Sequence, residues 1–137
     1  MTAKEYLKQY RLLESRIRTV KDNLSILESK RESISVDMDG MPHASGTSDK
    51  TGTLAVAIQS AKDKLSTLQH ESIIKQHEVA QTILRLDDPD YINILNARYI
   101  DGMTWESIAV KLHFSYRWVC TLHGRALLEV DKIINSK

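Results

Sequence analysis

The sequence predicts an all-α protein, and three observations support this fold class. Two prolines and five glycines among 137 residues leave long stretches without helix breakers. Up to residue 86, apolar residues recur at steps of three and four. Three short segments that begin with helix-capping residues then follow. We expect a long, coiled-coil-like antiparallel helical hairpin at 1–86, with a loop at 38–53, and a three-helix helix-turn-helix domain at 87–137.

The first long helix is predicted from Lys4 to Asp37, a stretch without glycine or proline. A series of apolar side chains recurs at alternating steps of four and three: Tyr6, Tyr10, Leu13, Ile17, Val20, Leu24, Leu27 and Ile34. Arg31 occupies the one slot that breaks this series. The pattern is a heptad seam of about four repeats. A seam this narrow is not stable alone in water, so the helix needs a partner.

The second long helix is predicted from Thr53 to Leu86 and supplies that partner. Its seam carries Leu54, Ile58, Ala61, Leu65, Leu68, Val79 and Leu86, while Ser72 and Lys75 take core slots. The connection at 38–53 holds three glycines and a proline, which predicts a loop and makes the two helices antiparallel. Further apolar residues, Ile73, Ile74, Ile83 and Leu84, predict a second face for dimerisation. The alternative interpretation is that the hairpin serves only as a structural scaffold.

The third part of the chain has the signals of three short helices. Asp88 fits an N-cap with Pro89 at the first helical position, and the helix stops at Gly102. Thr104 and Ser115 fit the caps of the next two helices. The side chains predicted to face inward are Tyr91, Ile94, Leu95, Tyr99, Trp105, Ile108, Ala109, Leu112, Val119, Leu122, Ala126 and Val130. Three short helices with a tight turn before the last predict a helix-turn-helix.

Composition excludes several classes of protein. Nineteen Lys and Arg against 18 Asp and Glu give a net charge of +1, so any nucleic-acid surface must be local. A single cysteine, Cys120, excludes an internal disulfide and fits a reducing cytoplasm. The charged start lacks a signal-peptide core, and no apolar run approaches the roughly 18 residues of a membrane span.

No catalytic, metal or cofactor site is predicted. His43 and Asp49 lack a second His or Cys at ligand spacing, and His70 and His77 stand two helical turns apart. No glycine-rich loop follows a strand, and no Ser-His-Asp set is present in the pattern. We therefore expect a binding protein and not an enzyme.

The C-terminal residues carry a resemblance to a known family. The segment "ILNARYIDGMTWESIAVKLHFSYRWVCTLHGRALLEV" resembles region four of bacterial sigma factors, which reads the promoter −35 element. The shared pattern covers about residues 92–130: "RYIDGMTWESIA", a turn, Ser, three variable residues, Val and a "GRAL" ending. The whole chain, including "EYLKQYRLLE" and "GMPHASGTSDKTG", resembles small phage proteins of Gram-positive hosts, the late-transcription regulators of the ArpU and RinA kind.

Two positions differ from what the family pattern and helix propensity favour: a histidine where glycine is usual, and a glycine within a helix. Such turns usually place Gly where His113 stands, because the backbone there is often left-handed; His is among the few other residues that tolerate this conformation. Gly124 falls in mid-helix, at a cost of roughly 1 kcal/mol against Ala. We expect it to permit close approach of a neighbouring helix or of a DNA backbone.

The resemblance implies where DNA would bind. Arg117, Cys120 and Thr121 would meet base edges, and the Arg117 guanidinium suits guanine O6 and N7. The residues placed for phosphates are Thr104, Lys111, Tyr116, His123 and Arg125. Trp118 has two interpretations, burial against the hairpin or contact with DNA.

Three functions compete at this stage. The favoured one is a sequence-specific regulator of double-stranded DNA, an activator of phage late genes in the bacterial cytoplasm. Its hairpin would serve to form a homodimer or to contact host RNA polymerase. The second is a small terminase subunit, which couples a helix-turn-helix to oligomerisation. The third is a module that docks on RNA polymerase without reading DNA, in keeping with the near-neutral charge.

Overall fold

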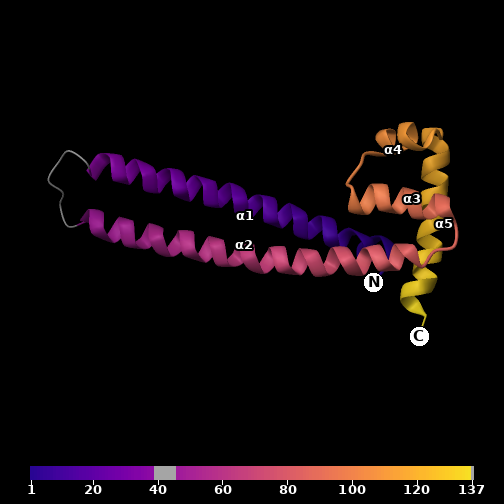
Figure 1. Ribbon diagram of the computed structural model, residues 1–137, viewed down its shortest axis with the longest axis horizontal. Helices are drawn as coiled ribbons and strands as arrows, with labels where there is room; N and C mark the ends of the chain where they lie inside the picture. Colours follow the sequence, from indigo (N-terminus) through magenta and orange to yellow (C-terminus); the bar gives the residue numbers. More distant parts are fainter. Residues whose placement is uncertain (39–45, 137) are drawn as a thin grey trace. The chain divides into compact units, whose positions relative to one another are not determined.

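The computed structural model describes residues 1–38 and 46–136, with side chains at 1–34 and 49–136. The described residues are helical and contain no strand, so the all-α prediction is confirmed. The elements are α1 (Ala3–Met38), α2 (Gly46–Leu84), α3 (Pro89–Leu95), a π-helical turn η1 (Asn96–Ile100), α4 (Trp105–Leu112) and α5 (Tyr116–Asn135) (Figure 1). In the described part of the chain, no helix is both long and apolar enough to cross a membrane.

Helix α2 begins earlier than predicted. Residues 46–53, predicted as part of the loop at 38–53, form its first two turns. Asp49 lies in the first turn, where the positive end of the helix favours a carboxylate. Glycine and serine content therefore misled the sequence prediction over this stretch. Residues 39–45, including His43, lie outside the described residues.

The chain divides into two compact units, residues 14–71 and residues 1–13 with 72–137. The first consists of α1 and α2 alone, which run side by side in opposite directions (Figure 1). Arg16 and Val20 line a groove with Leu68, and farther along α1 Leu27 and Ile34 line a groove with Leu54. Rising numbers on α1 therefore meet falling numbers on α2. The seam side chains are buried or half-buried as the heptad pattern predicts: Ile17, Val20, Leu24, Leu27, Leu54, Ile58, Ala61, Leu65 and Leu68.

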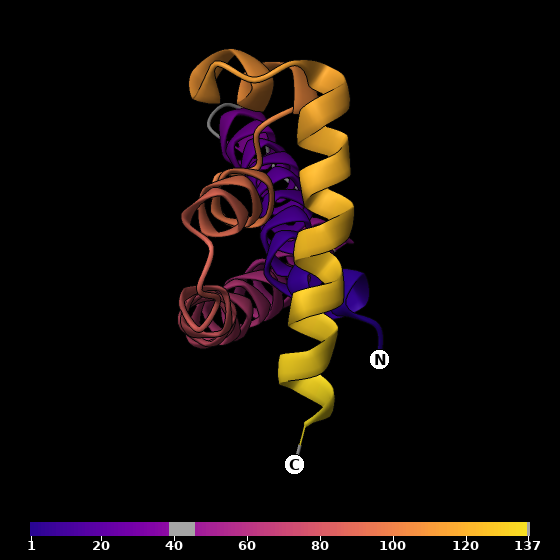
Figure 2. The same cartoon turned by 90° about the vertical axis from the view of Figure 1, so that its right-hand side faces the viewer.

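The second unit combines both ends of the chain. One core cluster draws on α1, α2, α3, η1 and α5, and it contains Ala3, Leu7, Val79, Ile83, Leu86, Leu95, Tyr99, Ala126 and Val130. Figure 2 shows the first turns of α1 beside α5. The backbone N–H of Ala3 donates to Asp131 Oδ1 at 2.8 Å, and the Tyr6 and Thr82 hydroxyls lie 2.9 Å apart. The predicted domains 1–86 and 87–137 stay a prediction. In the structure, the first turns of α1 and the last turns of α2 share one core with the C-terminal helices.

A second core cluster joins the three C-terminal helices. Its buried members are Ile94, Ala97, Ile108, Ala109, Val119 and Leu122, with Trp105 and Leu112 half-buried against it. The predicted caps are confirmed: Asp88 accepts from the N–H of Asp90, Thr104 from that of Ser107, and Ser115 from that of Trp118.

Both turns of this unit use a left-handed residue. Gly102 has φ of 69° before α4, and His113 has φ of 60° between α4 and α5. The left-handed conformation expected at His113 is confirmed. The backbone N–H groups of His113 and Phe114 return to carbonyls of α4, which closes the turn tightly before Ser115.

The π-helical turn η1 was not predicted. The N–H of Asp101 donates to the carbonyl of Asn96 at 3.0 Å, five residues back, so this turn is wider than an α-helical one. It directs Tyr99 into the core while Arg98 stays half-buried. Such turns often mark functional positions in helices.

The apolar residues predicted for a second face of α2 divide into two groups. Ile83 is 1% exposed and belongs to the core, so it was wrongly included. Ile73, Ile74 and Leu84 are exposed. Of the four residues predicted for a second face, only Ile73, Ile74 and Leu84 are therefore accessible to a partner.

Candidate nucleic-acid interface

The first two turns of α5 expose a polar and aromatic face. Val119 and Leu122 turn into the core, while Arg117, Cys120 and Thr121 are exposed. The cap at Ser115, whose Oγ accepts from the N–H of Trp118 at 3.1 Å, fixes where this face begins. The structure therefore brings the three predicted base-reading residues together on one side of one helix.

Local contacts set the chemistry of that face. Thr121 Oγ1 donates to the carbonyl of Arg117 at 3.0 Å, so the hydroxyl proton is used and the oxygen keeps lone pairs for a donor. The thiol of Cys120, one turn after Tyr116, is the largest cause that raises the pKa of the Tyr116 phenol above 10.0. Tyr116 is thus a neutral donor at neutral pH, half-exposed at 50%.

Trp118 and Arg125 form a pair beside this face. The Arg125 guanidinium lies 5.3 Å from the centre of the Trp118 ring, a cation–π geometry. The ring is 40% exposed, so burial against the hairpin does not describe it. The Arg125 guanidinium thus stacks on the Trp118 ring, and both side chains remain exposed to solvent.

His123 lies apart from the other residues predicted to bind phosphate. Its Nε2 is 2.7 Å from the Tyr99 hydroxyl, and its ring packs edge-on against Trp105 at 4.5 Å. Burial, followed by the charges of Lys4 and Arg98, lowers the pKa of His123 to about 4. At neutral pH the His123 ring is therefore uncharged, and it is already bonded to Tyr99 and packed against Trp105. It is not a positively charged group that could bind a phosphate.

The remaining predicted residues lie on α4 and its cap. Thr104 Oγ1 donates to Ser107 Oγ at 2.9 Å while it caps the helix, so its hydroxyl is already engaged. Lys111 is exposed in the last turn of α4 and forms no ion pair within the described residues. Gly124 has no atom within 4 Å of an added Cβ, so no neighbouring helix within the described chain approaches it.

Arg98 is a candidate site residue that the sequence did not indicate. Its guanidinium lies 4.4 Å from the centre of the Trp105 ring, and Nη1 donates to the carbonyl of Met103 at 2.9 Å. Its charge also lowers the pKa of Tyr116 slightly against the larger opposing causes. The position depends on the π-helical turn, for which the sequence has no recognised signal.

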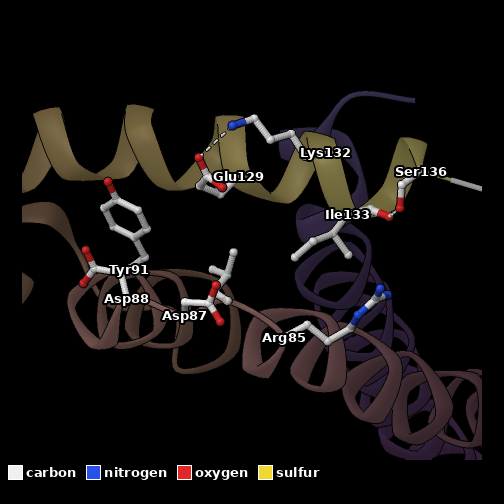
Figure 3. Close-up of a pocket in the computed structure, with 9 residues that line it drawn as sticks. Arg85, Asp87, Asp88, Tyr91, Glu129, Lys132, Ile133 and Ser136 are labelled. Atoms are coloured by element: carbon white, nitrogen blue, oxygen red, sulfur yellow. Dashed lines mark hydrogen bonds and ion pairs between the residues drawn. The ribbon is translucent and has the colours of Figure 1, made fainter.

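A separate cleft lies at the other end of α5 (Figure 3). Tyr91 and Ile133 point into the space between α5 and the α2–α3 connection, and Lys132 pairs with Glu129 at 3.1 Å. Asp87, Asp88 and Arg85 complete a lining of mixed charge. No group of three metal-ligating side chains is found in the part of the chain that the structure describes.

Comparison with known proteins identifies the family and no individual relative. No curated protein and no solved structure matches the chain. A family described as "Protein of unknown function (DUF1492)" matches residues 34–131, which is the larger part of the sequence. The chain belongs to the DUF1492 family.

Proposed function

We propose that this protein is a sequence-specific transcription regulator that inserts the N-terminal half of α5 into the major groove of double-stranded DNA. The observation that carries the proposal is the exposed face of Arg117, Cys120 and Thr121, which follows a tight left-handed turn at His113. In helix-turn-helix proteins this part of the last helix contacts base edges. A core helix alone would gain nothing from exposing such a face.

The arrangement proposed is a helical hairpin joined to a helix-turn-helix of sigma region four type. Arg117 would donate two hydrogen bonds to guanine, while Arg125 and Lys111 would contact phosphates. The resemblance to phage late-transcription regulators makes activation of late genes the proposed role, with host RNA polymerase as a partner. The exposed Ile73, Ile74 and Leu84 support a homodimer, because they leave apolar area on α2 uncovered.

One alternative has an observation of its own. Val110 on α4 is 77% exposed and Leu128 on α5 is 62% exposed, and Glu106 places an acid near Tyr116. Exposed apolar residues and a nearby acid favour a protein partner, in keeping with a module that docks on RNA polymerase without reading DNA. A terminase small subunit is the other alternative and predicts a large ring.

Selection from a pool of random duplexes tests the proposal. The full chain is incubated with the pool at moderate salt, and bound duplexes are sequenced. The proposal expects a short enriched sequence of defined spacing, whereas a docking module would enrich none. Light scattering on the same sample gives the oligomeric mass, and a ring of many subunits would favour the terminase alternative.

A further inference from the structure

A cationic cleft lies between α1 and the turn that joins η1 to α4. Its lining comprises Lys8, Arg11, Leu12, Arg98, Tyr99 and Gly102, and its volume is about 380 Å³. Three of these side chains are cations and none is a carboxylate. In a chain of net charge +1, this is a local concentration of positive charge.

The cations of α1 are fixed in place by buried neighbours. Ala3 and Leu7 are 1% and 0% exposed and pack in the core cluster that contains Ala126 and Val130 of α5. The first turns of α1 therefore cannot turn about their axis without opening that core. Lys8 and Arg11 stand three residues apart, on one side of the helix, and the Arg11 guanidinium lies against Gly102.

Arg98 closes the cleft from the opposite side. Its stacking on Trp105 and its bond to the carbonyl of Met103 fix the guanidinium, yet these contacts use one of its five N–H donors. The other donors remain for an anion. Trp105 in turn packs against His123 of α5 at 4.5 Å, so the cleft lies close to the N-terminal half of α5.

Lys8, Arg11 and Arg98 take part in none of the ion pairs found among the described residues. The ion pairs of the described residues are Lys75–Glu78 and Lys132–Glu129, and both lie elsewhere. Glu5 accepts from the N–H of Thr2 instead. Asp101, next to Gly102, is exposed and forms no ion pair with them.

We propose that this cleft binds the sugar–phosphate backbone of the same duplex whose major groove α5 enters. The inference rests on the proposed function, and it adds the N-terminal turns of α1 to the DNA-binding surface. Lys8 and Arg11 precede residue 34, where the family match begins. Two guanidinium groups suit phosphate because each donates in a fork that matches two phosphate oxygens. The contact would increase affinity for every sequence and specify none.

The test uses the full chain with Lys8→Ala and Arg11→Ala combined. Binding to a random-sequence duplex of 30 base pairs is titrated at several salt concentrations. Because each phosphate contact contributes about 0.9 to the slope of log affinity against log salt, the double variant is expected to have a slope shallower by up to about 1.8. Arg98 is left intact, since its loss would also remove the contacts to Trp105 and Met103.

Two further variants make the result specific. Lys21→Ala with Arg31→Ala removes one lysine and one arginine from exposed positions of α1 in the other unit, and should leave the slope unchanged. Lys8→Arg with Arg11→Lys preserves both charges and should retain the wild-type slope. Circular dichroism melts check that each variant is folded.

The outcomes separate this inference from the proposed function. If the wild type binds duplexes and the double variant keeps its slope and affinity, the cleft inference fails and the proposed function stands. If the wild type binds no duplex, the proposed function fails first. A wild type that instead binds poly-glutamate, and loses this binding in the double variant, would overturn the phosphate assignment in favour of an acidic protein partner.

Discussion

Replacing Arg117 with Ala separates base reading from every other role of α5. The side chain is exposed, lies outside the buried stripe of Val119 and Leu122, and forms no ion pair in the described part of the chain. Its loss should therefore change the free energy of unfolding by no more than about 0.5 kcal/mol. A loss of DNA affinity larger than this would therefore reflect contacts with DNA and not a loss of folding.

The magnitude follows from the chemistry of a guanidinium on guanine. A bidentate contact discriminates against the wrong base by about 1–3 kcal/mol, which is about 5- to 150-fold in affinity. Arg117→Ala should lose that factor on the selected duplex and relax the preference at one base pair. On a scrambled duplex the loss should be smaller.

Arg125→Ala is the matched comparison. This residue stacks on Trp118 at 5.3 Å and is proposed to contact phosphate, so its removal should weaken all sequences alike. Loss of the exposed cation–π contact should cost about 0.5–1 kcal/mol of stability. The assay is a competition titration of both variants on selected and scrambled duplexes. The base-reading role is refuted if Arg117→Ala stays folded and binds both duplexes with wild-type affinity.

Four residues give further predictions about stability. The pKa of His123, about 4 in the folded chain, is below its unfolded value of 6.5, so the unfolded chain binds the extra proton between these values. Stability should fall as pH decreases from 6.5 to 4, less steeply in His123→Gln; equal slopes in urea titrations would count against this. At His113, with φ of 60°, Val should cost about 1–3 kcal/mol while Gly should cost little, and a tolerated Val in thermal melts would contradict the strain. Gly124→Ala should stabilise by about 1 kcal/mol, because the added Cβ meets nothing within 4 Å; a lower melting temperature would show an unrecognised neighbour. Leu7→Ala should cost about 2–5 kcal/mol, and a change below 1 kcal/mol would mean that α1 does not share the core.

The features that the sequence predicted well are local. Each cap at Asp88, Thr104 and Ser115 depends on a side-chain oxygen and a backbone N–H two or three residues away. The left-handed turn at His113 is likewise set by the residues between α4 and α5. The buried stripe of α5 follows from the helical period alone. Such local signals can be recognised without knowing which segments of the chain pack against one another.

The features that it missed depend on contacts between distant segments. His123 is polar and falls within the candidate DNA-binding half of α5, yet Tyr99 and Trp105 hold it inside. The π-helical turn that positions Arg98 has no recognised signal in the sequence. The charges of Lys8 and Arg11 read as part of a solvated helix face, because their position beside Gly102 appears only when α1 packs on the C-terminal helices.

The shared core explains why the C-terminal helices do not form a separate unit. Taken alone, the C-terminal helices α3, η1, α4 and α5 would expose a large surface for the apolar area that they enclose, and small domains of this size are marginal in stability. Ala3 and Leu7 from α1, with Val79 and Ile83 from α2, enlarge that core. The same packing places the first turns of α1, up to Leu13, beside α5, and with them the positions of Lys8 and Arg11. One set of contacts therefore has two consequences. It stabilises the C-terminal helices, and it places Lys8 and Arg11 beside them.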